Sequence, residues 1–285
     1  MPASPSVPPQ SVIVSRLRAA GCVFAEDEAQ VLIVAARTAA DLTAMVERRA
    51  AGQPLEHVIG WAEFCGLRIA VDPGVFIPRR RTEFLVRQAV VLARQGATAD
   101  GEARTGPSTV VVDLCCGSGA LGAALVAVLD EVELHAADID PAAVRCARRN
   151  LAAAGQVHEG DLYDPLPAAL RGRVGILVAN VPYVHTEEIR LLPAEARVHE
   201  ARVALDGGAD GLDPLRRVAA AAASWLAPGG HLLVEASARQ APEAVETVAR
   251  GGLIPRLASS EELNATVVIG TRPAAPFVPR GGRVA

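Results

Sequence analysis

A glycine-rich segment with a carboxylate beside it is the first feature of the sequence that could do chemistry. Residues 117–122 read GSGALG and match G-x-G-x-x-G, the pattern that turns a strand into a helix against a nucleotide. The apolar strand before this segment reaches Asp113, and three residues separate that acid from Gly117. A carboxylate there is a poor host for pyrophosphate at a helix N-terminus, but it suits the sulfonium and ammonium charges of S-adenosylmethionine. We therefore favour S-adenosylmethionine over NAD, and we expect the binding loop to comprise Asp113, Cys115, Cys116, Gly117, Ser118 and Gly119.

Two more acidic residues follow apolar segments further along the chain. Asp138 ends the next strand, where its carboxylate could accept both ribose hydroxyls of an adenosine cofactor. Asp161 follows the stretch where a third strand should end, and it could accept the adenine amino group while Leu162 packs on the ring. Each acid alone is typical of a solvated loop. Three acids at successive strand ends favour one cofactor site.

The segment Asn180-Val181-Pro182-Tyr183 closes an apolar strand, so its polar groups should lie at the ligand-binding edge of the sheet. We expect it to hold a planar NH₂ group and to be the catalytic segment. The Asn180 side-chain oxygen would accept one N–H and the Val181 carbonyl the other, with Tyr183 packed against the plane. Pro182 stiffens the backbone and removes a donor. A simple turn with a core tyrosine is the structural alternative.

No general base is evident near this segment, because we interpret His185 as a surface residue. We expect catalysis by positioning instead. Orientation can lower a barrier by up to roughly 7–11 kcal/mol, and acceptors aimed at developing charge add to this effect.

The elements that must position these groups alternate between strand and helix, which predicts an α/β Rossmann-like domain with a parallel sheet. We expect five parts along the chain: a disordered tail (1–10), a helical substrate-docking domain (11–60), a β-hairpin linker (61–80), the methyltransferase domain (81–272) and a second disordered tail (273–285). Asp41 is the expected N-cap of a helix over 41–50. The expected strands cover 61–67, 68–71, 75–78, 109–114, 133–138, 175–180, 231–235 and 265–270.

The amino-acid composition excludes several classes of ligand and chemistry. The net charge is −4, which argues against stable binding to a nucleic-acid backbone. All 28 basic residues are arginine, so lysine Schiff-base chemistry and a Walker-type loop are excluded. The five cysteines form no CxxC pair, and we expect reduced thiols, no metal site and a cytoplasmic location. We expect neither a signal peptide nor a membrane span.

The chain resembles the HemK/PrmC family of protein-(glutamine N5) methyltransferases, which modify the Gly-Gly-Gln glutamine of release factors. The resemblance extends to about Arg272, and the most specific motif is PGVFIPR at residues 73–79. Other shared segments are QPL (53–55), IG (59–60), EFCGL (63–67), TE (82–83), HE (199–200) and LDGG (205–208).

The resemblance implies a cofactor loop at 115–119, a ribose acid at Asp138, an adenine-side contact at Leu162 and a glutamine site on 180–183. It also implies that Asn180 contacts both the cofactor and the substrate. It also places Phe76 and Arg79 at the border of the pocket. Three features depart from the family pattern: Val181 replaces a proline, Cys115 and Cys116 replace smaller residues, and Arg80-Arg81 replace Pro-Glu. These departures indicate a divergent branch, so the substrate stays open between a release factor and another glutamine-containing protein.

Two other functions stay open at this stage. The same N-x-P-Y chemistry serves exocyclic amino groups of adenine or guanine in nucleic-acid methyltransferases, although no added nucleic-acid module is evident. Such an enzyme must also extrude its base. The altered loop would also fit a cofactor-binding interaction protein without turnover.

Overall fold

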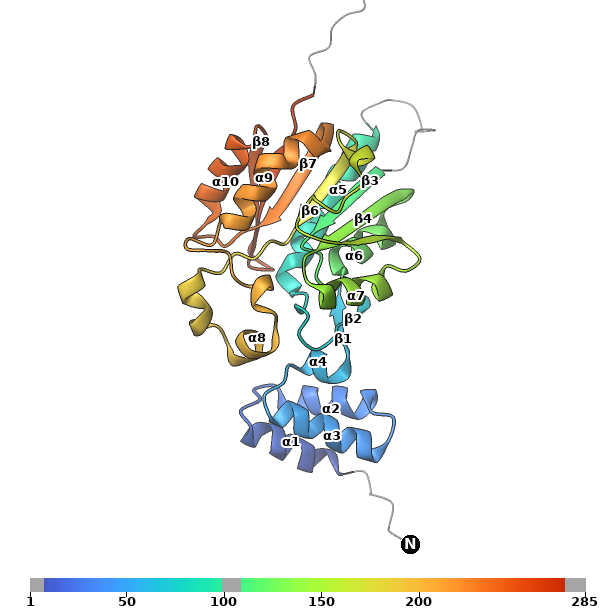
Figure 1. Cartoon of the computed structure of the whole chain (residues 1–285). Helices are drawn as coiled ribbons and strands as arrows, with labels where there is room; N and C mark the ends of the chain where they lie inside the picture. Colours follow the sequence, from blue (N-terminus) through green and yellow to red (C-terminus); the bar gives the residue numbers. More distant parts are fainter. Residues whose placement is uncertain (1–7, 99–108, 275–285) are drawn as a thin grey trace, which may run out of the picture.

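The computed structural model describes residues 8–98 and 109–274, which form a small helical unit and a larger α/β domain joined by a β-hairpin (Figure 1). The tails expected at 1–10 and 273–285 lie largely outside these ranges, although Gln10 already begins the first helix. Within the described ranges, no helix is long and apolar enough to cross a membrane.

Seven strands form the central sheet in the order β5-β4-β3-β6-β7-β9-β8. The strands from β5 to β7 pair in parallel, whereas β9 pairs antiparallel with both β7 and β8. The α/β fold is therefore of the predicted Rossmann-like type, with an antiparallel edge. The strands are β3 (Thr109–Leu114), β4 (Val132–Asp138), β5 (Gly155–Glu159), β6 (Val174–Ala179), β7 (Leu226–Glu235), β8 (Ile254–Ser260) and β9 (Ala265–Thr271).

Helices cover both faces of this sheet, because the inner strands carry apolar side chains on both faces. On one face Ile176 and Val178 pack with α5, α6 and part of α7. On the other face Leu177 and Ala179 pack with α9 and α10. The helices are α5 (Glu83–Thr98), α6 (Ala120–Val128), α7 (Pro141–Asn150), α8 (Ala194–His199), α9 (Asp213–Trp225) and α10 (Ala241–Arg250). Short 3₁₀ helices lie at Arg80–Thr82, Ala168–Leu170, Thr186–Leu191 and Arg202–Ala204.

The helical unit has its own aliphatic core, in which Leu17 and Leu32 are fully buried. It comprises α1 (Gln10–Ala19), α2 (Ala25–Ala35), α3 (Ala39–Ala50) and the short α4 (Leu55–Ile59), which the sequence did not predict. The expected Asp41 cap is wrong. Thr38 is the N-cap, and its hydroxyl accepts the Asp41 N–H at 3.1 Å.

The hairpin is shorter than expected. Strands β1 (Trp61–Phe64) and β2 (Leu67–Ala70) pair antiparallel around Cys65 and Gly66, both at positive φ. The strand expected over 75–78 is wrong, because this stretch forms no ladder and Gly74 makes only an isolated bridge to Glu200. Strand β8 was missed because it is an edge strand with mixed exposure and no alternating pattern.

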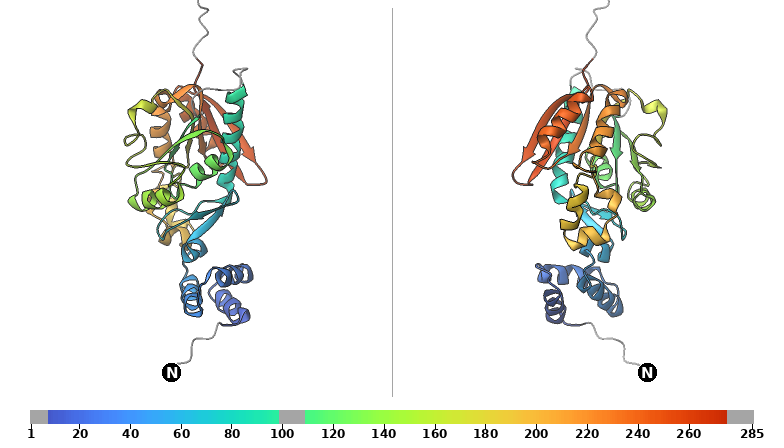
Figure 2. Two further views of the ribbon diagram at one scale, coloured as in Figure 1. Left: turned by 90° about the vertical axis from the view of Figure 1, so that its right-hand side faces the viewer. Right: turned by 60° about the vertical axis from the view of Figure 1, so that its left-hand side comes forward.

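An ion-pair cluster centred on Arg49 joins the helical unit to the larger domain. In Figures 1 and 2 the unit stands at the end of the molecule where the hairpin and α8 lie. Arg49 on α3 binds both carboxylate oxygens of Glu28 on α2, at 2.5 and 3.0 Å. Its third nitrogen donates to Glu195 on α8 at 2.7 Å and to the Gln53 carbonyl at 3.0 Å. Only 9% of the Arg49 side chain is exposed, so the pair is largely desolvated.

We expect Arg49→Met to lower the free energy of unfolding by about 3 kcal/mol, because it leaves the Glu28 carboxylate without its cation. Urea denaturation measures this change. The matched control is Arg16→Met at an exposed position of α1, which should stay within about 0.5 kcal/mol of the wild type. Equal loss in both variants would show that the cluster contributes no specific stability.

Candidate active site

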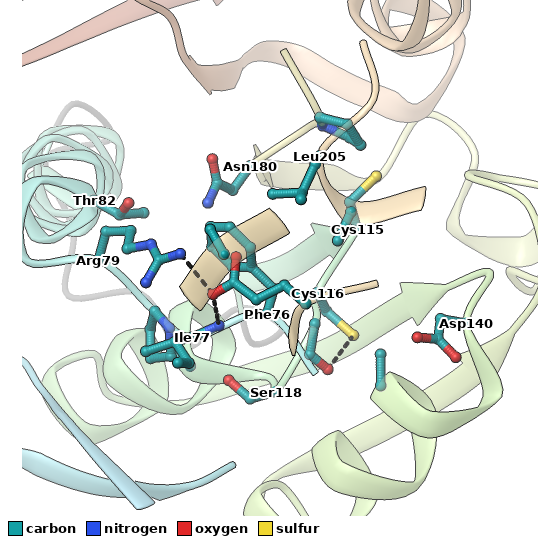
Figure 3. Close-up of a pocket in the computed structure, with 18 of the residues that line it drawn as sticks. Phe76, Ile77, Arg79, Thr82, Cys115, Cys116, Ser118, Asp140, Asn180 and Leu205 are labelled. Carbon is teal, nitrogen blue, oxygen red and sulfur yellow. Dashed lines mark hydrogen bonds and ion pairs between the residues drawn. The ribbon is translucent and has the colours of Figure 1, made fainter. Parts of the chain in front are cut away.

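The carboxyl ends of β3, β4 and β6 open into a cavity of about 460 Å³. Its wall also takes in the segment after the hairpin and the residues around α8. Figure 3 shows Arg79 and Thr82 on one side and Asp140 on the other, with Asn180, Phe76 and Cys116 between them. The predicted site residues that line the cavity are Phe76, Arg79, Cys115, Cys116, Gly117, Ser118, Asp138, Asn180, Val181, Pro182 and Tyr183.

The glycine turn is held by Asp138 at the end of β4. The Gly117 N–H donates to Asp138 Oδ2 at 2.8 Å, and the Asp140 N–H donates to Oδ1 at 2.9 Å. Each carboxylate oxygen keeps a free lone pair, so Asp138 can still accept further hydroxyl donors. Gly117 and Gly119 have φ of 54° and 77°, which favours glycine. A Cβ on Gly119 would meet Leu151 at 3.0 Å, so this residue packs the loop on α7 rather than lining the cavity.

Asp113 lies beneath the loop and does not line the cavity. Its side chain is fully buried, and Oδ2 accepts the Gly122 N–H at 3.0 Å. Oδ1 has no hydrogen-bond partner within the described ranges. Burial raises the pKa of Asp113 to about 7, with a further contribution from the charge of Asp138. Asp113 therefore supports the loop from beneath and makes no direct contact with the cavity.

The two loop cysteines are not reactive thiols. Burial raises the pKa of both Cys115 and Cys116, and the charges of Asp113 and Asp138 raise it further. The protonated thiol is a weak nucleophile. Cys115 adopts φ of 54°, a conformation that an L residue rarely takes, so the turn geometry needed there is kept without a glycine.

Asp161 and Leu162 do not line the cavity either. Asp161 forms a 2.5 Å ion pair with Arg217 on α9, and Leu162 packs against the core beneath α9. The expected contacts with an adenine therefore stay predictions, and Asp161 would have to share its oxygens with Arg217.

The segment after β6 is fixed from several sides. Asn180 follows the strand directly, and its Oδ1 atom is buried without a hydrogen-bond partner in the part of the chain that is described. Val181 is buried in the core. The Gln240 amide donates to the Tyr183 carbonyl at 3.0 Å. Gly211 packs so closely that a Cβ there would lie 2.4 Å from the same oxygen.

The Tyr183 hydroxyl belongs to a network that sequence reasoning missed. It donates to Glu235 Oε1 at 3.2 Å and also bonds Arg81. Arg81 Nε and the Thr82 hydroxyl complete the shell of Glu235 at 2.9 and 2.6 Å. Burial and the Glu235 charge raise the pKa of Tyr183 to about 12, so the phenol stays protonated. Glu235 is a polar residue at the end of the apolar strand β7, just as Asn180 is a polar residue after β6. This shared pattern could have identified Glu235 as a candidate site residue from the sequence. His185 is half-buried and does not line the cavity.

The order of the strands, the glycine turn over an acid and the cavity at their carboxyl ends define a Rossmann-like methyltransferase. A family model described as "Methyltransferase small domain" matches residues 102–211. The solved structure of the 16S rRNA N2 G1207 methyltransferase of T. thermophilus, in complex with AdoMet and guanosine, is similar with a TM-score of 0.51 at 18% identity. That match covers 74% of this chain and 49% of the other, and it supports the fold alone.

Sequence relatives place the chain more narrowly. The release factor glutamine methyltransferase of Geobacter sulfurreducens is 35% identical over 231 residues, which cover 80% of this chain and 76% of the relative. The chain belongs to the release factor glutamine methyltransferase family, which confirms the resemblance seen in its motifs. A 4-amino-L-phenylalanine/4-methylamino-L-phenylalanine methyltransferase of Streptomyces pristinaespiralis is 36% identical, covering 67% of this chain and 63% of that protein.

We expect Asp113→Asn to change how stability depends on pH. The folded pKa of about 7 lies above the unfolded value of ~3.9, so between these values only the folded state holds the proton. From pH 5 to pH 6 the wild type should therefore lose about 1.4 kcal/mol per pH unit relative to the variant, and the slope should fall to about half by pH 7. Urea denaturation at several pH values measures the difference. Asp164→Asn, at an exposed position, is the control and should run parallel to the wild type. A parallel Asp113→Asn curve would contradict the raised pKa.

Proposed function

We propose that this protein transfers a methyl group from S-adenosylmethionine to the side-chain amide nitrogen (N5) of a glutamine in a protein substrate, the Gly-Gly-Gln segment of a release factor. The observation that carries the proposal is the buried Asn180 Oδ1, which has no hydrogen-bond partner among the described residues. Burying an acceptor unpaired costs free energy, and Asn180 lines the cavity, so a ligand that brings a donor to this residue would remove the cost. A primary amide supplies that donor.

The donor set around the cavity fits S-adenosylmethionine. Asp138 keeps lone pairs for the ribose hydroxyls, and Gly117 lines the cavity with no side chain that would fill it. The Asp138 carboxylate lines the cavity beside the loop, which favours a cationic ligand over a pyrophosphate. Asp161 and Leu162 would lie toward the adenine. When bound, this cofactor supplies an electrophilic methyl group.

The residues at 180–183 orient the nucleophile. An amide nitrogen is weakly nucleophilic because its lone pair is delocalised into the carbonyl. The Asn180 oxygen and the Val181 carbonyl would accept the two N–H groups, stabilise positive charge that builds on nitrogen, and aim the lone pair at the methyl carbon. Tyr183, held by Glu235 and Arg81, supplies a fixed ring beside the amide plane. The proton then leaves to solvent.

A planar NH₂ group also occurs on nucleobases and on arylamines such as 4-amino-L-phenylalanine. The net charge of −4 weighs against a nucleic acid as the substrate. The Arg49 cluster brings the helical unit next to α8, whose residues line the cavity. This arrangement favours a polypeptide substrate over a small amine, and we propose that the helical unit docks that polypeptide.

We expect Asn180→Ala to lower kcat at least ~100-fold, because it removes one of two groups aimed at the developing charge. Methyl transfer to a release factor and to a Gly-Gly-Gln peptide is followed by mass spectrometry of the labelled peptide. Asn264→Gly is the control and should keep full activity, because Asn264 is exposed, does not line the cavity and has φ of 47°, which glycine adopts without strain.

The affinity for S-adenosylmethionine, measured by calorimetry, should change little in Asn180→Ala. Near-normal turnover by this variant would refute the positioning mechanism. If the wild type methylates 4-amino-L-phenylalanine or a nucleic acid but no glutamine peptide, the proposed substrate class is wrong.

A further inference from the structure

Asn150, the last residue of α7, binds both the glycine turn and the hairpin with a single side-chain amide. Its Nδ2 atom donates to the Ser118 carbonyl at 2.8 Å and to the Ala70 carbonyl at 2.9 Å. Its Oδ1 atom accepts the Ala70 N–H at 3.0 Å. Asn150 does not line the cavity, so any effect that it has on a ligand must pass through the turn.

The orientation of this amide is fixed by its partners. One end of the amide faces two carbonyl oxygens, which require a donor, and the other end faces an N–H group, which requires an acceptor. Both protons of the NH₂ group are therefore used. A side chain of the same shape that lacks these donors, such as an aspartate, would place an oxygen against both carbonyls.

The glycine turn needs support from outside because its backbone conformation is uncommon. Gly117 and Gly119 both have positive φ. Asp138 holds the first half of the turn by accepting the Gly117 N–H, and Asn150 holds the second half through the carbonyl of the buried Ser118. A buried carbonyl without a donor costs free energy. Without Asn150 the turn would therefore favour other conformations.

The C-terminal end of α7 also packs directly against the glycine turn. A Cβ on Gly119 would lie 3.0 Å from Leu151 and 3.2 Å from Ala147. This close contact sets the distance across which the Asn150 amide reaches the Ser118 carbonyl. The turn cannot move toward the helix, so loss of the bond would let it move only away from α7.

We propose that Asn150 is a positioning residue for the cofactor, which keeps the glycine turn in its binding conformation by tying Ser118 to strand β2. The inference rests on the proposed function, in which this turn binds S-adenosylmethionine. Gly117, the residue before Ser118, lines the cavity. If only a fraction of the molecules has the binding conformation, the apparent affinity falls by that fraction. Asn150 thus raises the affinity by preorganising the turn, without touching the ligand.

Calorimetry with S-adenosylhomocysteine tests the proposal on the full chain. We expect Asn150→Ala and Asn150→Asp to bind this ligand about 10-fold more weakly, because each removes the donor to the Ser118 carbonyl. Asn150→Asp keeps the side-chain volume and the acceptor for the Ala70 N–H, so it separates the lost donor from lost packing. Poor folding would lower the binding stoichiometry, whereas the proposal predicts a lower affinity at full stoichiometry.

Arg149→Gln is the matched control. Arg149 is the neighbouring residue on α7, and it binds Asp72, just after the hairpin, at 2.7 Å. The substitution removes another contact between α7 and the hairpin segment but leaves the Ser118 bond in place, so the affinity should stay within about twofold of the wild type. In methyl-transfer assays, the Asn150 variants should show a raised KM for S-adenosylmethionine and a kcat near that of the wild type.

The wild type offers a measurement that does not depend on how any variant folds. Ala70 does not line the cavity, but its N–H donates to Asn150. A ligand that stabilises the turn should by linkage also stabilise this bond, so S-adenosylhomocysteine should slow hydrogen exchange of the Ala70 N–H at least about fivefold. Nuclear magnetic resonance measures the exchange rate. The amides of α1, which belongs to the separate core of the helical unit, are the reference and should change less.

Three results overturn the proposal. In the first, both Asn150 variants bind S-adenosylhomocysteine as the wild type does. In the second, Arg149→Gln loses as much affinity as they do, so that the docking of α7 on the hairpin matters and the Ser118 bond does not. In the third, the ligand leaves exchange at Ala70 unchanged. A wild type that binds S-adenosylhomocysteine but methylates no glutamine would instead refute the proposed function, while the binding data would still decide the role of Asn150.

Discussion

The site depends on one constraint: a buried hydrogen-bond acceptor must find a donor, and at Asn180, which lines the cavity, the protein does not supply one. Asn180 Oδ1 is shielded from solvent and unpaired in the described residues. The parallel strand β6, which ends directly before Asn180, holds the residue in place. Such atoms are rare in folded proteins and call for an explanation by function. The side-chain amide of the proposed glutamine substrate would supply the missing donor.

The two sides of the cavity differ in charge: acidic residues lie at the glycine turn, and arginines lie on the opposite side. Asp138 lies beside the glycine turn, where its carboxylate would stabilise a sulfonium, and Asp113 lies beneath the turn. Arginines gather on the other side, but Arg79 and Arg81 are each paired with a buried glutamate. Paired arginines act as rigid supports rather than as free anion sites. Arg81 in particular holds the Tyr183 hydroxyl together with Glu235, so this unusual residue takes part in positioning the N-x-P-Y segment.

Much of the framework was predictable because it follows local rules. Apolar strand runs predicted the parallel sheet, and the glycine turn, Asp138 and Asn180 were located by their spacing from strand ends. The sequence did not predict contacts made between distant segments. The Glu200 side chain accepts the N–H of Ile77, which is more than a hundred residues away in the sequence. Glu235, at the end of β7, bonds Arg81 and Tyr183. Burial of Asp113 beneath the loop, and the pairing of Asp161 with Arg217, likewise depend on packing that no local pattern encodes. The edge strand β8 lacked an apolar rhythm because half of it faces solvent.

The central claim is tested most directly by a crystal structure of the full chain with S-adenosylhomocysteine and a Gly-Gly-Gln peptide. The account predicts that the glutamine amide nitrogen lies within hydrogen-bond distance, about 2.9 Å, of both Asn180 Oδ1 and the Val181 carbonyl oxygen. Its remaining face should point at the cofactor sulfur. A glutamine that lies elsewhere in the cavity, or an Asn180 oxygen that stays unpaired in that complex, would contradict the account.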